Sequence, residues 1–217
     1  MTVFALVRHG ETDWNRARRI QGASDIPLND TGRAQAAAAG QLLAGRAWSR
    51  IVASPLSRAS ETAQIIAREA GLGEVEHDGS FVERNYGEVE GLTGAELDTR
   101  FPEGVDVPGR ETREAVAERV IAGLHRLADA HPGEAIIVVA HGGVIRSVLE
   151  SVAPGHHREP ITNGSIHSFQ HAYGGLELVV FDDPLDEQSI FPYADDYDDQ
   201  NPLAHREDGR EAAGGDR

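Results

Sequence analysis

The sequence predicts an α/β fold, a three-layer α/β/α sandwich around a mostly parallel, mixed sheet. Two apolar runs, residues 3–7 and 135–140, have the composition of strands buried on both faces. Helical patterns alternate with strands along most of the chain, which is typical of a parallel sheet covered on both faces. Residues 165–171 and 176–181 are predicted strands with no helix between them, so an antiparallel element is expected there.

The first half of the chain predicts strand and helix twice. After the strand at 3–7, an irregular stretch extends to about residue 29. An Ala-rich helix then runs from Asp30, a good N-cap, to about residue 44. A short strand at 50–54 precedes a helix over about 57–70, which has apolar or small residues on one face.

The second half begins with an irregular segment. Residues 81–110 are rich in glycine and glutamate, with a short helical stretch near 94–100, and this composition indicates a functional surface excursion. The other predicted elements are a helix over 111–130, the buried strand 135–140, a helix over 144–152, and a closing hairpin of 165–171 and 176–181.

The chain is expected to form one domain and an appendage. Residues 1–183 hold all the predicted helices and strands. Residues 184–217 are rich in aspartate, proline and glycine, so we expect an acidic, largely irregular tail with its last dozen residues disordered. Its apolar segment Ile190-Phe191-Pro192-Tyr193 has no role that the sequence assigns.

Composition limits the partners and the chemistry. The formal net charge is −16 and all 20 basic residues are arginines, which argues against nucleic acid or an anionic membrane as a partner. The chain has no cysteine, so disulfides, thiolate catalysis and cysteine metal sites are excluded. No signal-peptide pattern and no apolar run of ~20 residues is present, so we expect a cytoplasmic protein. A homodimer is compatible with the sequence.

Reactive side chains follow several of the predicted strands. Arg8 and His9 end the first strand, Arg58 follows the strand at 50–54, Glu83 begins the excursion, and His141 ends the second buried strand. If these strands are parallel, all of these groups meet at one edge of the sheet, where open α/β sheets bind ligands.

The residue types at this edge favour a phosphoryl ligand. Guanidinium groups, the amides of Gly142 and its neighbour, and a helix N-terminus all match phosphate oxygens. Nearby arginines lower the pKa of a histidine, which keeps a ring nitrogen nucleophilic and makes a covalent phosphohistidine plausible. The leaving alkoxide needs a proton. Glu83, Glu88 and Glu90 are candidate donors, and spacing alone does not choose among them.

The motifs resemble those of a known family. They are, in chain order, Leu6-Val7-Arg8-His9-Gly10-Glu11-Thr12-Asp13-Trp14-Asn15 with Gln21-Gly22 and Asp25-Ile26-Pro27-Leu28, then Ser54-Pro55-Leu56-Ser57-Arg58-Ala59 with Thr62-Ala63, then Glu83-Arg84 with Gly87 and Glu90-Gly91, and finally Val139-Ala140-His141-Gly142-Gly143-Val144-Ile145-Arg146. Over roughly residues 3–181 the chain resembles the histidine phosphatase superfamily, the phosphoglycerate mutase-like proteins.

The resemblance implies roles for individual residues. His9 would be the nucleophile that becomes phosphorylated, and Glu83 would donate the proton and later activate water. The phosphoryl oxygens would be held by Arg8, Arg58 and His141, with a further hydrogen bond from Asn15. The implied mechanism uses no metal and no cofactor, and the sequence has no His-Glu-x-x-His or similar ligand spacing.

The family contains hydrolases and mutases, and a mutase must exclude water and hold a second acidic group of its substrate. Mutases that resemble this chain have a long basic insertion after the Glu-Gly block. The corresponding segment here, residues 92–111, is short, and its only basic residues are Arg100 and Arg110. We therefore favour a metal-independent phosphomonoester hydrolase acting on a small phosphorylated metabolite. The alternatives are phosphate transfer of the phosphoglycerate mutase type and a non-catalytic phosphate-binding sensor. The sequence does not identify the substrate.

Other polar residues are interpreted without a catalytic role. The adjacent His156 and His157 lie between Pro154-Gly155 and Pro160 and are assigned to an exposed loop, and Asn163 and Ser165 are taken as turn residues before the hairpin.

Overall fold

The computed structural model describes residues 1–184. The elements in chain order are β1 (Thr2–Arg8), α1 (Asp13–Arg16), α2 (Asp30–Leu43), β2 (Arg50–Ala53), α3 (Ser57–Ala70), β3 (Glu76–His77), the 3-10 helices η1 (Gly79–Phe81) and η2 (Gly87–Val89), α4 (Gly94–Arg100), α5 (Arg113–Ala130), β4 (Ala135–Ala140), α6 (Gly142–Val152), β5 (Ile166–Ala172) and β6 (Gly175–Val180). Apart from Pro184, the predicted tail and its segment Ile190-Phe191-Pro192-Tyr193 lie outside the described residues.

The strands form one mixed sheet in the order β3-β2-β4-β1-β5-β6. β4 is parallel to both β1 and β2, and β2 is parallel to β3. β5 runs antiparallel to β1 and to β6, as expected for the closing hairpin. The register places Leu6 of β1 opposite Val138 of β4 and His167 of β5. The predicted mostly parallel sheet is confirmed.

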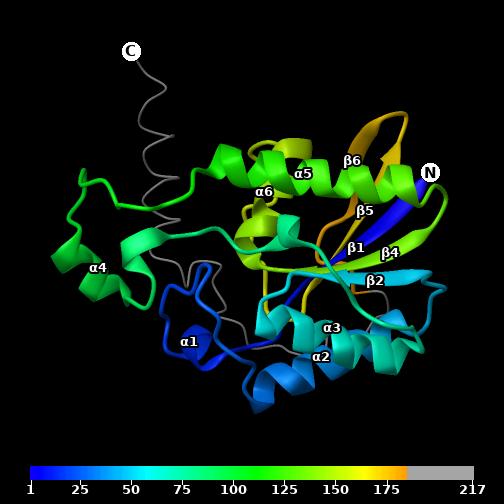
Figure 1. The fold of residues 1–217 in the computed structure, drawn as a ribbon, viewed down its shortest axis with the longest axis horizontal. Helices are drawn as coiled ribbons and strands as arrows, with labels where there is room; N and C mark the ends of the chain where they lie inside the picture. Colours follow the sequence, from blue (N-terminus) through cyan, green and yellow to red (C-terminus); the bar gives the residue numbers. More distant parts are fainter. Residues whose placement is uncertain (185–217) are drawn as a thin grey trace.

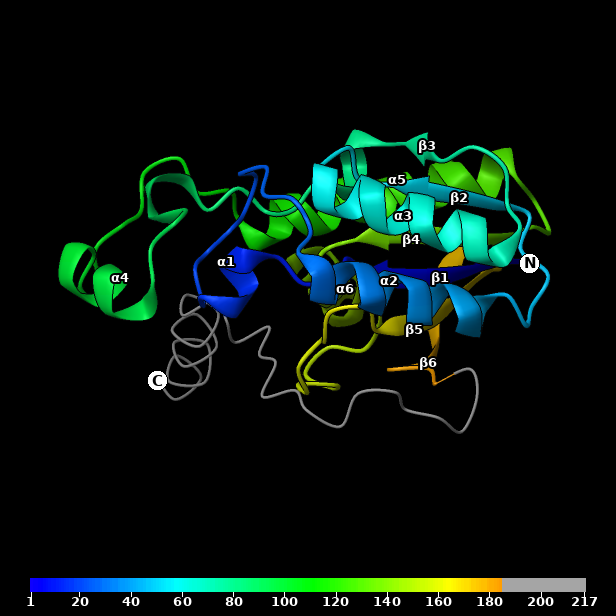
Figure 2. The ribbon, with the colours of Figure 1, turned by 90° about the horizontal axis from the view of Figure 1, so that it is seen from below.

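Helices cover both faces of the sheet (Figures 1 and 2). Alternate residues of β1 point to opposite faces because the side chains of a strand have a period of two. Phe4 and Leu6 pack in one core with apolar residues of α5 and α6. Ala5 and Val7 pack in the other core with alanines and aliphatic residues of α2 and α3. The three-layer architecture is therefore confirmed.

The excursion at residues 81–110 is the part of the described chain that extends furthest from the sheet, with α4 at its tip (Figure 1). It has a small apolar core of its own, formed by Ile20, Tyr86, Val89, Leu97, Phe101 and Val107. Backbone hydrogen bonds between Ile20 and residues 91 and 92 join it to the segment that follows β1. The excursion is thus packed in place and lies beside the first part of the chain.

Four short elements were not predicted, namely α1, β3, η1 and η2. α1 depends on a capping box, in which Thr12 and Asn15 bond each other's backbone N–H groups, and it has only 4 residues. β3 has 2 exposed residues and is defined by its pairing with β2 alone, so no hydrophobic pattern marks it. None of the helices within residues 1–184 is long and apolar enough to cross a membrane.

Candidate active site

His9 and His141 leave the sheet side by side. β1 and β4 are parallel neighbours and Arg8 is paired with Ala140, so the next residue of each strand lies just beyond the same edge. The two imidazole rings are 5.1 Å apart between centroids and meet edge to face at 60°. Both side chains are buried, with exposed fractions of 3% for His9 and 0% for His141. The predicted convergence of these two histidines is confirmed.

The tautomer of His9 follows from its neighbour. Its Nδ1 lies 2.6 Å from the carbonyl oxygen of Gly10, and because a carbonyl only accepts, Nδ1 must carry the proton. Nε2 is then the unprotonated nitrogen. Burial lowers the pKa of His9 well below its ordinary value, and the charges of Arg58 and Arg8 lower it further. The ring is therefore neutral and nucleophilic at Nε2 near neutral pH.

Two buried arginines flank this ring. Arg58, at the start of α3, is fully buried and donates to the carbonyl oxygens of Ser24 and Gly22, both at 2.7 Å. Burial lowers its pKa to about 10, against the opposing effect of nearby carboxylates, so it stays charged at neutral pH. Arg8 donates to the carbonyl of Ile161. Backbone carbonyls thus fix both guanidinium groups next to His9.

Three buried nitrogens of this group have no hydrogen-bond partner within the described residues. They are Nε of Arg8, Nε of Arg58 and Nδ1 of His141. The other ring nitrogen of His141, Nε2, is 2.8 Å from Oγ of Ser54. Buried polar atoms are nearly always bonded, so three unbonded nitrogens in one cluster of arginine and histidine side chains mark it as a candidate anion site.

The N-terminus of α6 adds backbone donors. The helix begins at Gly142, directly after His141, so its first amides carry the positive end of the helix dipole. Gly143 donates to Oε2 of Glu83 at 3.1 Å. A Cβ at Gly143 would lie 2.6 Å from Oε1 of Glu83, so a larger residue there would displace this carboxylate. Arg84 N–H binds Oε1 at 2.7 Å. Glu83 therefore lies beside the His141 end of the site.

The three glutamates of the excursion have different surroundings. Glu88 is exposed and its nearest basic group is Arg100, at 3.8 Å. Glu90 faces a loop of the first part of the chain, where Oε1 accepts from Ala23 N–H at 2.9 Å and Oε2 from Ser24 N–H at 2.8 Å. Of the three, only Glu83 has a described contact with the residues that follow His141.

Glu90 supports the Arg58 side of the site indirectly. The loop that it holds includes Gly22 and Ser24, the residues whose carbonyls bind Arg58. Gly22 has φ of 57°, and a Cβ there would lie 2.1 Å from Oε1 of Glu90. This supporting role was not predicted, because it depends on a contact between segments 66 to 67 residues apart.

Asn15 is buried at the first turn after β1, 4% exposed. Its Oδ1 accepts from the backbone N–H and the hydroxyl of Thr12, both at 3.1 Å. These bonds orient the amide and leave Nδ2 as the group able to donate to a ligand. The capping box thus gives Asn15 a local structural role, while its predicted bond to the phosphate stays a prediction.

Two further residues position the backbone around His9. Oγ1 of Thr62 accepts from Gly10 N–H at 3.1 Å and donates to the carbonyl of Arg58 at 2.7 Å, linking the two sides of the site. Asn163, predicted as a turn residue, donates to the carbonyl of His9 at 2.9 Å. Within residues 1–184, no three His, Asp or Glu side chains are grouped so as to hold a metal ion.

Comparisons with known proteins agree with this geometry. The family model described as the histidine phosphatase superfamily, branch 1, matches residues 4–184. A relative from Bacillus subtilis, the uncharacterized phosphatase PhoE, is 43% identical over 155 residues, covering 71% of this chain and 79% of its own. The metal-independent phosphoserine phosphatase of Arabidopsis thaliana is 34% identical over 179 residues, covering 77% and 75%. The solved structure of mycobacterial glucosyl-3-phosphoglycerate phosphatase with VO3 superposes with a TM-score of 0.73 at 28% identity, covering 83% and 98%.

Proposed function

Because this chain belongs to branch 1 of the histidine phosphatase superfamily, we propose that its phosphatase reaction proceeds through a phosphohistidine on His9. The observation that carries the proposal is the state of that ring. It is buried between two arginines, its Nδ1–H is bound to a carbonyl, and its Nε2 is unprotonated. Such a nitrogen is activated without a neighbouring base.

In the first step Nε2 of His9 attacks phosphorus and the bond from phosphorus to the alcohol oxygen breaks. The carboxyl group of Glu83 gives its proton to that oxygen, so a neutral alcohol leaves. Arg8, Arg58, His141 and the amide of Gly142 bind the phosphoryl oxygens, with Nδ2 of Asn15 as a further donor. Donors already fixed in a buried site stabilise the transition-state charge without reorganising.

In the second step water attacks the phosphohistidine. The carboxylate of Glu83 accepts a proton from this water, the bond from phosphorus to Nε2 breaks, and inorganic phosphate is released. Glu83 is thereby protonated again for the next cycle, as a general acid and base must be.

The proposed substrate class is a small phosphomonoester, and neither a metal nor a cofactor takes part. The two relatives described above include a phosphoserine phosphatase, and the solved structure is of a phosphatase acting on glucosyl-3-phosphoglycerate. Both names specify a phosphate ester of a small molecule, which supports this class. The segment after Glu90 is short and has few basic residues, which supports hydrolysis over transfer of the phosphoryl group within the substrate.

The test is release of inorganic phosphate from a panel of phosphomonoesters that includes 3-phosphoglycerate and p-nitrophenyl phosphate. His9→Ala is expected to abolish turnover and the acid-labile phosphoenzyme, whereas the exposed-loop control His156→Ala keeps both. A His9→Ala protein with a tenth of the wild-type rate would remove the nucleophile assignment.

Glu83→Gln separates the acid from the nucleophile. Alkyl phosphates need protonation of the leaving oxygen, so we expect their kcat/KM, which reports phosphoenzyme formation, to fall ~10²- to 10⁴-fold, while kcat/KM for p-nitrophenyl phosphate, with a good leaving group, falls far less. Glu88→Gln is the matched control in the same excursion. Equal losses of kcat/KM on both substrates would show that Glu83 is not the proton donor.

A further inference from the structure

We infer that Arg119 and Glu111 form a clamp that positions the backbone of Glu83, and that the proton-transfer step depends on this clamp. The inference rests on the proposed role of Glu83 as the proton donor. Arg119 lies on α5 and Glu111 just before it, so neither residue belongs to the phosphate-binding group. Both are positioning residues, because they act on the reaction only through Glu83.

Glu83 needs support from outside its own segment. It lies between η1 and η2, in a stretch without helix or strand. By contrast, His9 and His141 directly follow β1 and β4, which the sheet ladder fixes. A proton donor must be within hydrogen-bond reach of the leaving oxygen, so a displacement of ~1 Å can cost up to ~10²-fold in rate.

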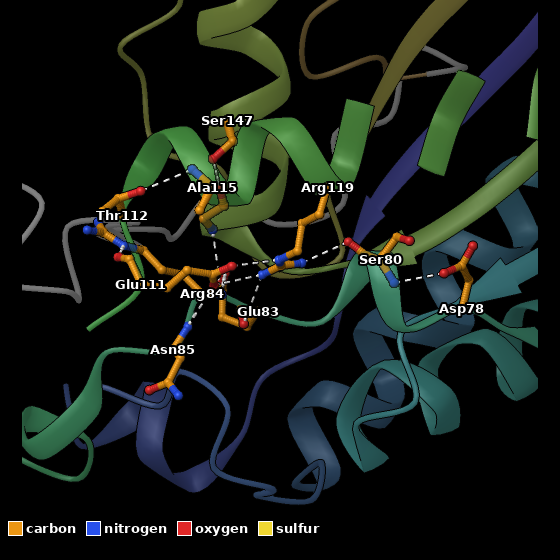
Figure 3. Close-up of polar contacts among 11 residues, drawn as sticks. Asp78, Ser80, Glu83, Arg84, Asn85, Glu111, Thr112, Ala115, Arg119 and Ser147 are labelled. Carbon is orange, nitrogen blue, oxygen red and sulfur yellow. Dashed lines mark hydrogen bonds and ion pairs between the residues drawn. The ribbon is translucent and has the colours of Figure 1, made fainter. Parts of the chain in front are cut away.

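Arg119 connects α5 to this segment by several hydrogen bonds (Figure 3). One terminal nitrogen, Nη1, donates to the carbonyl of Ser80 at 2.8 Å. The other, Nη2, lies 3.4 Å from the carbonyl of Glu83 itself. The guanidinium thus holds the backbone at both ends of residues 80–83 against a helix of 18 residues.

Glu111 fixes the guanidinium of Arg119 and also binds Arg84 and Asn85, the residues that follow Glu83. Its carboxylate binds Arg119 in a bidentate manner, with Nε at 2.8 Å from Oε1 and Nη2 at 3.0 Å from Oε2. Oε2 also accepts from Asn85 N–H at 3.2 Å, and the carbonyl of Glu111 accepts from Nε of Arg84 at 2.8 Å. Residues on both sides of Glu83 are therefore bonded to one ion pair (Figure 3).

The surroundings of the pair favour a defined geometry. The side chains of Arg119 and Glu111 are 26% and 23% exposed, so the pair is better shielded than a typical surface ion pair. Burial raises the pKa of Glu111, but the hydrogen bonds and charge of Arg119 outweigh it and lower the pKa overall. The charge of Arg119 is also among those that lower the pKa of His141, which places it within electrostatic range of the site.

The same helix offers a matched control. Arg126 also reaches toward η1, but it binds the side chains of Ser80 and Asp78, with Nη2 at 2.6 Å from Oγ and 3.3 Å from Oδ2. No bond from Arg126 to residues 81–85 is found in the described structure. Arg126→Ala thus removes an arginine from α5 without touching the backbone of Glu83.

The test measures kcat and KM for an alkyl phosphate and for p-nitrophenyl phosphate in Arg119→Lys, Glu111→Gln and Arg126→Ala. Lysine keeps the charge of Arg119 but lacks the planar guanidinium that binds a carboxylate through two nitrogens, and glutamine keeps the size of Glu111 but not its charge. We expect both clamp variants to lower kcat/KM for the alkyl phosphate ~10-fold or more and to change kcat/KM for p-nitrophenyl phosphate less than threefold, because kcat/KM reports phosphoenzyme formation and not the later attack of water. Arg126→Ala should match the wild type on both substrates.

Combination with Glu83→Gln gives the decisive result. If the clamp acts through Glu83, Arg119→Lys should cause no further loss on the alkyl phosphate in the Glu83→Gln protein. Full additivity of the two losses, or equal losses of the clamp variants on both substrates, would overturn the inference while leaving the proposed function intact. Failure of Glu83→Gln itself to discriminate between the substrates would instead refute the role of Glu83, and the inference with it. A clamp variant whose melting temperature falls but whose substrate ratio is unchanged would also overturn it, since that outcome describes a merely structural ion pair.

Discussion

The buried histidine His167 predicts a specific loss of stability at mildly acidic pH. It lies on β5, fully buried beside β1. Its Nδ1 accepts from the backbone N–H of Asp182 at 3.0 Å, so Nε2 carries the proton and lies 2.9 Å from Oγ of Ser165. Burial lowers the pKa of His167 to about 3; Arg146 adds to the lowering. The folded protein therefore holds this ring neutral.

The sign and size of the effect follow from linkage. The unfolded chain binds a proton at an ordinary histidine pKa of ~6.5, whereas folded His167 does not until about pH 3. Its contribution to stability is complete above pH ~7 and is lost as the pH falls through that interval. Each pH unit below ~6.5 costs about 1.4 kcal/mol, so the loss reaches ~2 kcal/mol at pH 5.

The assay is urea unfolding of the wild type and of His167→Gln at pH 7, 6 and 5, with His156→Gln as the exposed control. His9 and His141 also have lowered pKa values, so the wild type should lose more than the contribution of His167 alone. The difference between wild type and His167→Gln isolates one residue, and it should shrink by ~2 kcal/mol between pH 7 and pH 5. Parallel curves for the two proteins would refute the reasoning, because they would mean that His167 takes up its proton in the folded state.

Two further predictions concern the site. Because burial and two arginines lower the pKa of His9, kcat/KM for p-nitrophenyl phosphate, whose leaving group needs little protonation, should show no decline centred near pH 6.5 after correction for substrate ionisation, and such a decline would contradict the neutral-ring assignment. Glu90→Gln turns a carboxylate that accepts from residues 23 and 24 into an amide whose NH2 faces their donors, so the free energy of unfolding should fall by ~1–3 kcal/mol. Its kcat should fall for p-nitrophenyl phosphate and alkyl phosphates alike, because Arg58 loses the fixed carbonyls of that loop; a loss on alkyl phosphates alone would assign Glu90 to proton transfer instead.

Much of the sheet and of the edge that carries the candidate site could be predicted from the sequence, for a physical reason. The apolar runs that become β1 and β4 end abruptly, and parallel strands bring their carboxyl ends to one edge. The positions of His9 and His141 at the sheet edge therefore follow from where the two apolar runs end. In contrast, β3 was missed because its 2 exposed residues carry no periodic signal and are held by pairing with β2.

The glutamates of the excursion show where sequence reasoning ends. Glu83, Glu88 and Glu90 lie in the same segment, which is rich in glycine and glutamate, and no local pattern separates them. Their surroundings differ because of distant partners: Glu83 meets the amide of Gly143, and Glu90 meets the loop that holds Arg58. These contacts exist only once the excursion has packed against the sheet edge.

The proposed nucleophile and the proposed proton donor are therefore held by different means. His9 is fixed by the strand that delivers it, by Thr62 acting on Gly10, and by Asn163 acting on its own carbonyl. Glu83 lies in an irregular segment and is fixed by contacts from two helices, α6 through Gly143 and α5 through Arg119. Perturbing the sheet edge should lower the rate for every phosphomonoester, because phosphoenzyme formation needs His9 whatever the leaving group. Perturbing the contacts from α5 should lower the rate of phosphoenzyme formation in proportion to how much the leaving oxygen needs a proton. This difference in substrate dependence separates the two halves of the proposed mechanism.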